Sequence, residues 1–119
     1  MNLQEYQRLA ARTLIDRPDW EIPSDEIMLV WNAIGLAGEA GEVAELIKKG
    51  VFHRHRVDQA ALAKELGDVL WYAAALATSA GMNLEEIAEQ NIAKLRQRYP
   101  DGWSAAASQA RVDLQGDTI

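Results

Sequence analysis

Four acidic residues form two short pairs in this sequence, E-x-x-E at Glu39 and Glu42 and E-x-x-D at Glu65 and Asp68. A spacing of three places both members of a pair on one face of a helix. Carboxylates in apolar surroundings take up protons or bind a cation, and an all-oxygen ligand set favours Mg²⁺ or Mn²⁺ over zinc. The pattern therefore predicts a site for a hard divalent cation. Each pair also has a structural reading, because such acids occur on solvated helix surfaces and Asp68 alone could pair with an arginine.

A second set of polar residues lies further along the chain, at Asn91, Lys94 and Arg98. Asn91 falls in the middle of an apolar helix face, and Lys94 and Arg98 continue a stripe from it at spacings of three and seven. An amide and two cations suit phosphate oxygens, which arginine can bind with two parallel hydrogen bonds. The alternative is a hydrogen-bonded core asparagine with two bases whose alkyl stems cover apolar surface.

Other candidates are less specific. Asn32 and Trp20 are candidates for contacting the base or sugar of a nucleotide, and Glu45 is either an auxiliary ligand or a surface acid. The segment VFHRHRV contains both histidines of the chain, but His-x-His without further ligands is an incomplete zinc site. We interpret it as a solvated connector, and the alternative is a basic loop near the acids that touches a polyphosphate.

The elements that must position these groups are all helical. Apolar spacing and capping residues predict four helices, at residues 2–16, 25–49, 59–80 and 84–98. Ser24, Asp58 and Asn83 are the expected N-caps, whereas Gly50, Gly81 and Pro100 are the expected stops. No hairpin or period-two strand pattern occurs, so we expect an all-α, four-helix bundle-like single domain over residues 1–119, with a peripheral tail after about residue 104.

The two acidic pairs fall at matching heights if residues 25–49 and 59–80 form an antiparallel hairpin. Glu42 and Glu65 then lie level to within roughly 2 Å, as do Glu39 and Asp68, at a rise of about 1.5 Å per residue. The long helices are apolar on most of their remaining surface, so these stripes are expected to face inward. Four carboxylates would then meet across the helix pair.

Composition excludes several classes of protein. The 119 residues are 49% hydrophobic and contain no cysteine, which excludes disulfides and thiolate metal sites and suits a reducing compartment. The formal net charge of −6 argues against a nucleic acid polymer as partner, although a bound cation would still allow a nucleotide substrate. No apolar run reaches the roughly 20 residues of a membrane span, and the N-terminus lacks a signal-peptide layout. We expect a cytoplasmic protein without a membrane partner.

Three segments, GLAGEAGEVAELIKKG, KELGDVLWYAAALA and NIAKLRQRYPDGWS, resemble the MazG-like branch of the all-α nucleoside triphosphate pyrophosphohydrolases. The resemblance extends from LQEYQRLAARTL to about Ser104. It implies a helical fold that assembles as a homodimer or homotetramer. It further implies Mg²⁺-dependent cleavage of a nucleoside triphosphate to the monophosphate and pyrophosphate, with Glu39, Glu42, Glu65 and Asp68 as metal ligands and Asn91, Lys94 and Arg98 as phosphate-binding candidates.

We expect water attack at the α-phosphorus of a deoxynucleoside or non-standard nucleoside triphosphate, with the four acids as catalytic metal ligands and Glu39 also orienting the water. The alternatives are a narrow-specificity dUTP, dCTP or phosphoribosyl-ATP hydrolase of the same fold, or a non-catalytic helical oligomer that binds metal or nucleotide. One position departs from the family pattern: many relatives have a glutamate doublet, E-E-x-x-E, whose first position is Gly38 here.

Overall fold

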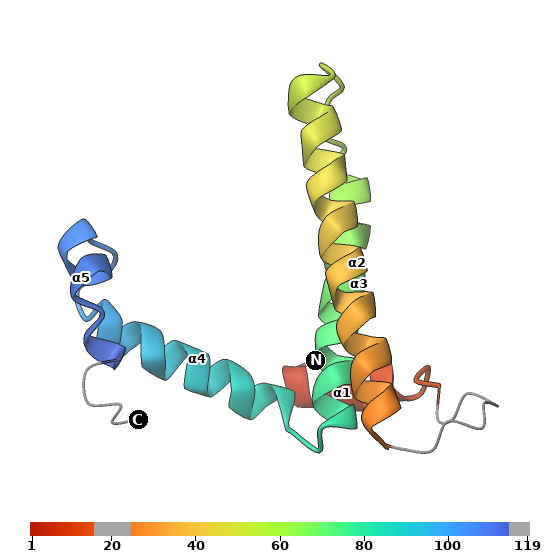
Figure 1. Cartoon of the computed structure of the whole chain (residues 1–119), viewed down its shortest axis with the longest axis horizontal. Coiled ribbons are helices and arrows are strands. Elements are labelled where there is room, and N and C mark those ends of the chain that lie inside the picture. Colours follow the sequence, from red (N-terminus) through yellow and green to blue (C-terminus); the bar gives the residue numbers. More distant parts are fainter. Residues whose placement is uncertain (16–24, 115–119) are drawn as a thin grey trace. The chain divides into compact units, whose positions relative to one another are not determined.

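Helices make up most of residues 1–15 and 25–114, which are the residues that the computed structural model describes. Its elements are α1 (Leu3–Ala11), α2 (Asp25–Phe52), α3 (Gln59–Ser79), α4 (Leu84–Arg98), α5 (Ala105–Ala110) and a 3₁₀ turn, η1 (Val112–Leu114) (Figure 1). No strand occurs in these two ranges, where the only β pairing is an isolated bridge between Pro100 and Gly102. The all-α prediction is confirmed. The chain divides into two compact units, residues 1–84 and 85–119.

The first unit is built on an antiparallel hairpin of α2 and α3, which lie side by side along their length (Figure 1). Asp58 caps α3 as predicted, because its Oδ1 accepts hydrogen bonds from the backbone N–H groups of Ala60 and Ala61 at 2.9 and 3.4 Å. The predicted end of α2 at residue 49 was wrong, since the helix continues through Gly50 to Phe52. A Cβ at Gly50 would collide with the side chain of Val57, so this glycine lets the returning chain approach the helix.

The end of α3 follows the sequence prediction. Gly81 adopts φ +70° immediately after the C-cap Ala80. The N–H of Met82 donates to the carbonyl of Ala77 at 2.8 Å and the N–H of Gly81 donates to that of Thr78 at 3.1 Å. These two bonds form a Schellman motif, which satisfies carbonyls that the end of the helix leaves open.

Helix α1 is fastened to α3 through the side chain of Gln7. Its Nε2 donates to Thr78 Oγ1 at 3.2 Å and to the carbonyl of Met82 at 2.9 Å, while its Oε1 accepts from the N–H of Leu84 at 2.8 Å. One side chain therefore links the first helix to the end of α3 and the start of α4.

Helix α1 ends at Ala11, earlier than the predicted residue 16. The backbone tightens there into i→i−3 hydrogen bonds, including one from Thr13 to Ala10 at 3.0 Å. The Thr13 hydroxyl donates to the same carbonyl and accepts from Trp71 Nε1, both at 2.9 Å. After Ala11 the chain is therefore held by local hydrogen bonds and by the hydrogen bond from Trp71 on α3, and the helix does not continue.

The described residues bury few large side chains. Among the described residues, the buried apolar ones are Ala74, Ala75, Ala77 and Leu84, and the one buried polar residue is Asn32, which is fully buried. Several large apolar side chains of the hairpin remain exposed, including Val30, Ile34, Val51, Phe52, Leu66 and Leu70. The α2–α3 pair therefore presents apolar surface that the described part of its own unit does not cover.

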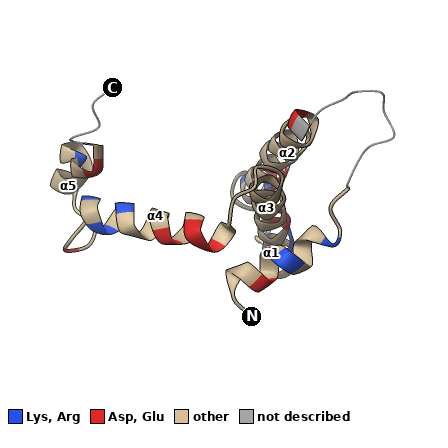
Figure 2. Ribbon diagram, turned by 90° about the horizontal axis from the view of Figure 1, so that it is seen from below, with Lys and Arg blue, Asp and Glu red and all other residues tan. Residues whose placement is uncertain are grey.

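The second unit consists of α4 and a returning segment. Acidic residues lie in the first turn of α4 and basic residues in its last, an order that complements the helix dipole (red and blue in Figure 2). The chain turns at Gly102, which has φ +84°, and Ser104 then caps α5 by accepting from the N–H of Ala107 at 3.0 Å. Arg111 takes a left-handed conformation, with φ 48°, before η1. The predicted tail thus contains two short helical elements.

None of the described helices combines the length and apolar character needed to cross a membrane.

Candidate metal and nucleotide site

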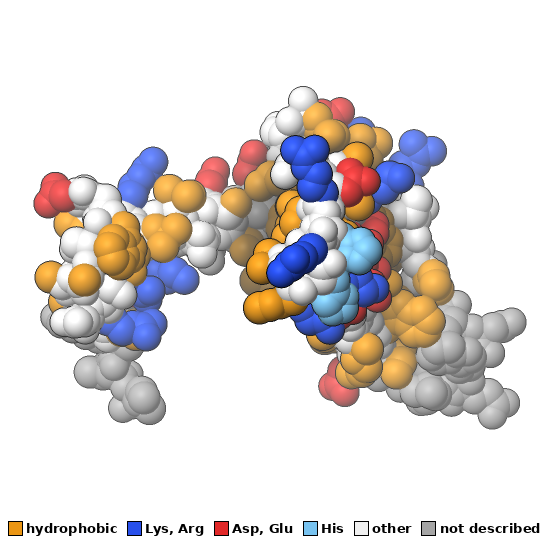
Figure 3. All heavy atoms as spheres, turned by 90° about the horizontal axis from the view of Figure 1, so that it is seen from above, with side chains coloured by type: hydrophobic (Ala, Val, Ile, Leu, Met, Phe, Trp, Pro, Cys, Tyr) orange, Lys and Arg blue, Asp and Glu red, His pale blue; other side chains and the backbone are white. Residues whose placement is uncertain are grey.

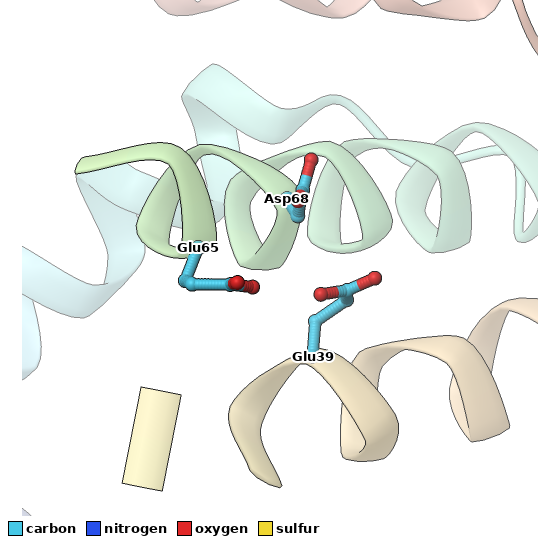
Figure 4. A group of neighbouring side chains, drawn as sticks. All are labelled: Glu39, Glu65 and Asp68. Atoms are coloured by element: carbon cyan, nitrogen blue, oxygen red, sulfur yellow. The ribbon is translucent and has the colours of Figure 1, made fainter. Parts of the chain in front are cut away.

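Three of the four predicted acids meet between α2 and α3. Glu39 projects from α2 toward Glu65 and Asp68 on the facing side of α3 (Figure 4). One carboxylate oxygen from each residue lies within 4.8 Å of the other two. The antiparallel hairpin thus brings together residues that lie far apart in sequence, as expected from their matching heights along the two helices.

The acidic cluster, defined as Glu39, Glu65 and Asp68, is only partly shielded from solvent. Glu39 and Glu65 are half-buried, whereas Asp68 is exposed. The expectation that the whole acidic stripe faces inward was therefore too strong for Asp68. Glu42 is also exposed and does not belong to the group within 4.8 Å, although it lies close enough for its charge to act on Glu39.

The surroundings of Glu39 shift the pKa of its carboxyl group. Partial burial raises the pKa of its carboxyl group, and the charges of Asp68, Glu65 and Glu42 raise it further. A hydrogen bond with the Glu65 carboxyl also raises the pKa of Glu39. A proton or a cation would relieve this repulsion, and the donor set consists entirely of carboxylate oxygens. The cluster therefore has the chemistry of a Mg²⁺ or Mn²⁺ site.

Tyr6 is a neighbour of the cluster that the sequence analysis did not single out. Partial burial of this α1 side chain raises the pKa of its phenol, and the charge of Asp68 raises it further. Helix α1 thus brings a hydroxyl group into the electric field of the acids. Helical spacing within one element carries no information about such a contact between elements.

Glu45 belongs to the helix surface. Its carboxylate pairs with Lys48 at 3.2 Å and with Lys49 at 3.6 Å, and these contacts lower its pKa. The structural reading is favoured for this residue, which gives a contrast with Glu39 on the same helix: one acid is neutralised by lysines and the other faces two further acids.

A small apolar pocket lies one helical turn beyond the cluster. It has a volume of about 280 Å³ and is lined by Trp31, Ile34, Gly35 and Tyr72. Gly35 precedes Glu39 by four residues and Tyr72 follows Asp68 by four, so both helices carry one residue of the pocket and one acid on the same face. A Cβ at Gly35 would collide with the Tyr72 ring, so the ring packs directly against the backbone of α2.

Of the two residues predicted to contact the base or sugar, only Asn32 lies in the described part of the chain. Asn32 is fully buried; its Nδ2 donates to Ser79 Oγ at 2.9 Å, and its Oδ1 has no hydrogen-bond partner among the described residues. This placement gives Asn32 a role in joining α2 to α3, and substrate contact stays a prediction. Trp20 lies outside the described residues.

The predicted phosphate-binding residues lie together on α4. Asn91 and Lys94 are exposed, which differs from the core position that the structural reading gave Asn91. Arg98, in contrast, is bound by a carboxylate of its own chain, Asp113, at 2.6 and 2.7 Å. Their role toward phosphate stays a prediction.

The connector between α2 and α3 contains four consecutive basic or titratable residues, at positions 53–56, and all four are exposed (blue and pale blue in Figure 3). The rings of His53 and His55 lie 6.4 Å apart between centroids, in an edge-to-face arrangement. No further metal-ligand group gathers around them in the part of the chain that the structure describes. The interpretation as a solvated connector agrees with this exposure.

Comparison with known proteins places these features in a family. The model of the MazG nucleotide pyrophosphohydrolase domain matches residues 32–103, a range that contains the acidic cluster, the pocket residues Gly35 and Tyr72, and the α4 stripe. No solved structure gives a significant match.

Curated relatives extend the match to nearly the whole chain. The chain is 36% identical to the Gene 37 protein of Mycobacterium phage L5 over 108 residues, covering 86% of this chain and 92% of that protein. It is also 33% identical to dCTP pyrophosphatase 1 of Mus musculus and 32% identical to that of Rattus norvegicus. Each alignment is 123 residues long with its gaps and covers 98% of this chain and 70% of the relative.

Proposed function

The chain belongs to the MazG nucleotide pyrophosphohydrolase family, and on this premise we propose that it hydrolyses a deoxynucleoside triphosphate, with dCTP as the first candidate, to the monophosphate and pyrophosphate. The observation that carries the proposal is the meeting of Glu39, Glu65 and Asp68 within 4.8 Å. The choice of dCTP is supported by the mouse and rat relatives, which are dCTP pyrophosphatases.

The acidic cluster fits Mg²⁺, with Mn²⁺ as the alternative. Glu39, Glu65 and Asp68 would hold the ion, and Glu42 is the further ligand that the sequence suggests. When bound, the ion would neutralise phosphate charge and lower the pKa of water. The raised pKa of Glu39 supports this assignment, because three carboxylates at this separation repel one another without a cation.

The chain's own residues then orient the reaction. Besides holding the ion, Glu39 would orient the attacking water in line with the α-phosphorus, and a carboxylate oxygen of the cluster that does not face the ion would accept the proton of that water. Attack forms a bond between the water oxygen and the α-phosphorus and breaks the bond from that phosphorus to the bridging oxygen. Pyrophosphate leaves with the electron pair of the broken bond.

The pocket of Trp31, Ile34, Gly35 and Tyr72 is our candidate for the nucleoside. Its position one turn from the acids matches a molecule whose ring and phosphates are joined by a short sugar. Aromatic and apolar walls suit a base, which can pack on them with its flat faces. Asn91, Lys94 and Arg98 remain the candidates for the outer phosphates, and Asn32 and Trp20 for further base or sugar contacts.

We further propose that the enzyme is a homodimer or homotetramer acting in the cytoplasm. The exposed apolar side chains of the hairpin support assembly: Val30 is 50% exposed, Ile34 68% and Leu66 51%. Apolar side chains that gather on a surface in this way are typical of protein interfaces. A second copy of the chain is the occupant that the family resemblance implies. A native mass of two or four chains would support this assembly, and a single-chain mass would contradict it.

The reaction is tested by incubating the protein with a panel of nucleotides and Mg²⁺ in ¹⁸O-labelled water. We expect release of pyrophosphate rather than orthophosphate, with the label in the monophosphate, because the water attacks the α-phosphorus. Stepwise orthophosphate release, or label in the pyrophosphate, would contradict the mechanism. Stabilisation by Mg²⁺ and nucleotide without turnover would instead identify a non-catalytic binding protein.

A further inference from the structure

The second unit contains a closely paired arginine and aspartate that the family assignment leaves unexplained. Arg98 Nε donates to Asp113 Oδ1 at 2.6 Å, and Arg98 Nη2 donates to Asp113 Oδ2 at 2.7 Å. The Asp113 side chain is 1% exposed and that of Arg98 is 18% exposed. Among the ion pairs of the described residues, the other three join exposed neighbours on a single helix. This pair therefore differs in both its burial and its geometry.

The chain uses a specific backbone path to form the pair. Arg98 is the last residue of α4, and the turn at Gly102, the capped helix α5 and the left-handed Arg111 bring the chain back to it. Glycine adopts a positive φ easily, but the left-handed conformation is unfavourable for an arginine such as Arg111. The returning segment thus accepts an unfavourable conformation immediately before Asp113.

The pair orients the Arg98 side chain without using all of its hydrogen-bond donors. A guanidinium group has five N–H bonds, and this side-on contact through Nε and Nη2 uses two of them. A hydrogen bond with the Tyr99 side chain uses a further one. The Nη1 edge lies outside the pair, and the guanidinium carbon also lies 5.9 Å from the centroid of the Tyr99 ring. The carboxylate therefore sets the plane of the guanidinium. The N–H bonds that neither Asp113 nor Tyr99 uses, here called the free edge, stay available to a further acceptor, which the remaining exposure of Arg98 allows.

We propose that Asp113 is a positioning residue that holds Arg98 in one orientation, so that the free edge of its guanidinium binds the phosphate groups of the substrate. This inference rests on the proposed function and adds a residue outside the range that the family model matches. A preset arginine loses less side-chain entropy on binding than a mobile one. Asp113 therefore acts on affinity for phosphate groups through Arg98, without touching the substrate.

The test compares Asp113→Asn with the matched control Asp101→Asn, since Asp101 is exposed and lies in the turn after α4. The amide of Asp113→Asn has a similar shape but cannot accept both hydrogen bonds. We expect the KM for the triphosphate to rise about tenfold, as for loss of one oriented charged contact, with kcat within about twofold of the wild type. Asp101→Asn should keep the wild-type KM.

Two outcomes would overturn the proposal. An unchanged KM in folded, active Asp113→Asn would make the pair purely structural, and a lower KM would make Asp113 a competitor of the phosphates. Arg98→Lys provides a second variant if Asp113→Asn fails to fold, because lysine can still pair with Asp113 but lacks the planar fork. We expect the same rise in KM, and a wild-type KM in Arg98→Lys would contradict the proposal.

Binding of inorganic pyrophosphate with Mg²⁺, measured by calorimetry, separates this inference from the proposed function. Weaker binding to Asp113→Asn than to Asp101→Asn supports positioning even if no nucleotide is turned over. Equal binding overturns positioning even if the wild-type protein hydrolyses dCTP.

Discussion

The acidic cluster of the first unit and the Arg98–Asp113 pair of the second unit are two opposite solutions to placing charge in a small protein. Glu39, Glu65 and Asp68 face one another, and partial burial together with the charges of the neighbouring acids raises the pKa of Glu39. Arg98 and Asp113 neutralise each other, and their contact lowers the pKa of Asp113. A proton or a cation would relieve the repulsion in the first arrangement, whereas the charges of the second are balanced within the chain. Repelling charges thus indicate where a ligand is needed, and paired charges indicate which side chain is held still.

We expect the largest loss of activity when one of the mutually repelling acids is removed. Asp68→Ala and Glu65→Ala should each lower kcat/KM for the triphosphate on the order of 10³-fold, the scale for losing one key electrostatic group at a reaction centre. Glu45→Gln is the matched control, because Glu45 lies on the same hairpin but is neutralised by Lys48 and Lys49. Activity that survives in both alanine variants would show that the cluster is not the reaction centre.

A second effect follows from the raised pKa of Glu39. Metal binding must displace the proton of this carboxyl, so the affinity for Mg²⁺ should fall by up to about tenfold per pH unit below the raised pKa. Between the ordinary and the raised pKa, the folded metal-free protein holds a proton that the unfolded chain has lost, so its stability falls as the pH rises through this window. Mg²⁺ should therefore raise the Tm more at higher pH.

Melting curves with and without Mg²⁺ across pH 4 to 8 would measure this effect (roughly the range in which a perturbed carboxyl titrates). A Mg²⁺-induced rise in Tm that stays constant with pH would contradict the inference that the metal displaces a proton from Glu39.

A third, smaller effect concerns the two glycines that precede the acids on α2. Gly35→Ala places a Cβ against the Tyr72 ring, so we expect a loss of about 1–3 kcal/mol in the free energy of unfolding and a higher KM. Gly38→Ala meets no atom within 4 Å and should stabilise the helix by up to about 1 kcal/mol. Equal melting temperatures for the two variants would contradict the close approach at Tyr72.

The smallest effect should come from a single exposed cation of the second unit. Lys94→Gln should raise the KM about threefold, because an exposed, flexible charge contributes little. Arg96→Gln is the control, since Arg96 lies two residues away and faces a different side of α4. A larger effect of Arg96→Gln would place the phosphate-binding face of α4 elsewhere.

Much of the fold was predictable because local signals determined it. The cap at Asp58, the stop at Gly81 and the range of α4 act through neighbouring backbone groups, and all of them agree with the structure. The errors lie where distant residues decide. Helix α2 continues past Gly50, where Val57 packs closely against the glycine. Helix α1 ends early, where Trp71 donates a hydrogen bond to Thr13.

The site shows the same division between local and distant information. The helical period and the matched heights were sufficient to bring Glu39, Glu65 and Asp68 together, because both depend on regular geometry. Tyr72 lies four residues after Asp68 on the same helix face, so its place beside the acids could be predicted from the helical spacing. Asp113 was not, since its partner is reached through a turn and a left-handed residue that no periodic pattern encodes.

The most direct test of the central claim is a titration of the wild-type protein with Mn²⁺ in the presence of a non-hydrolysable dCTP analogue, followed by electron paramagnetic resonance of the free ion. We predict saturable binding that Asp68→Ala and Glu65→Ala each weaken by at least about tenfold, while Glu45→Gln binds as the wild type does. Wild-type binding no tighter than that of the two alanine variants would contradict the account.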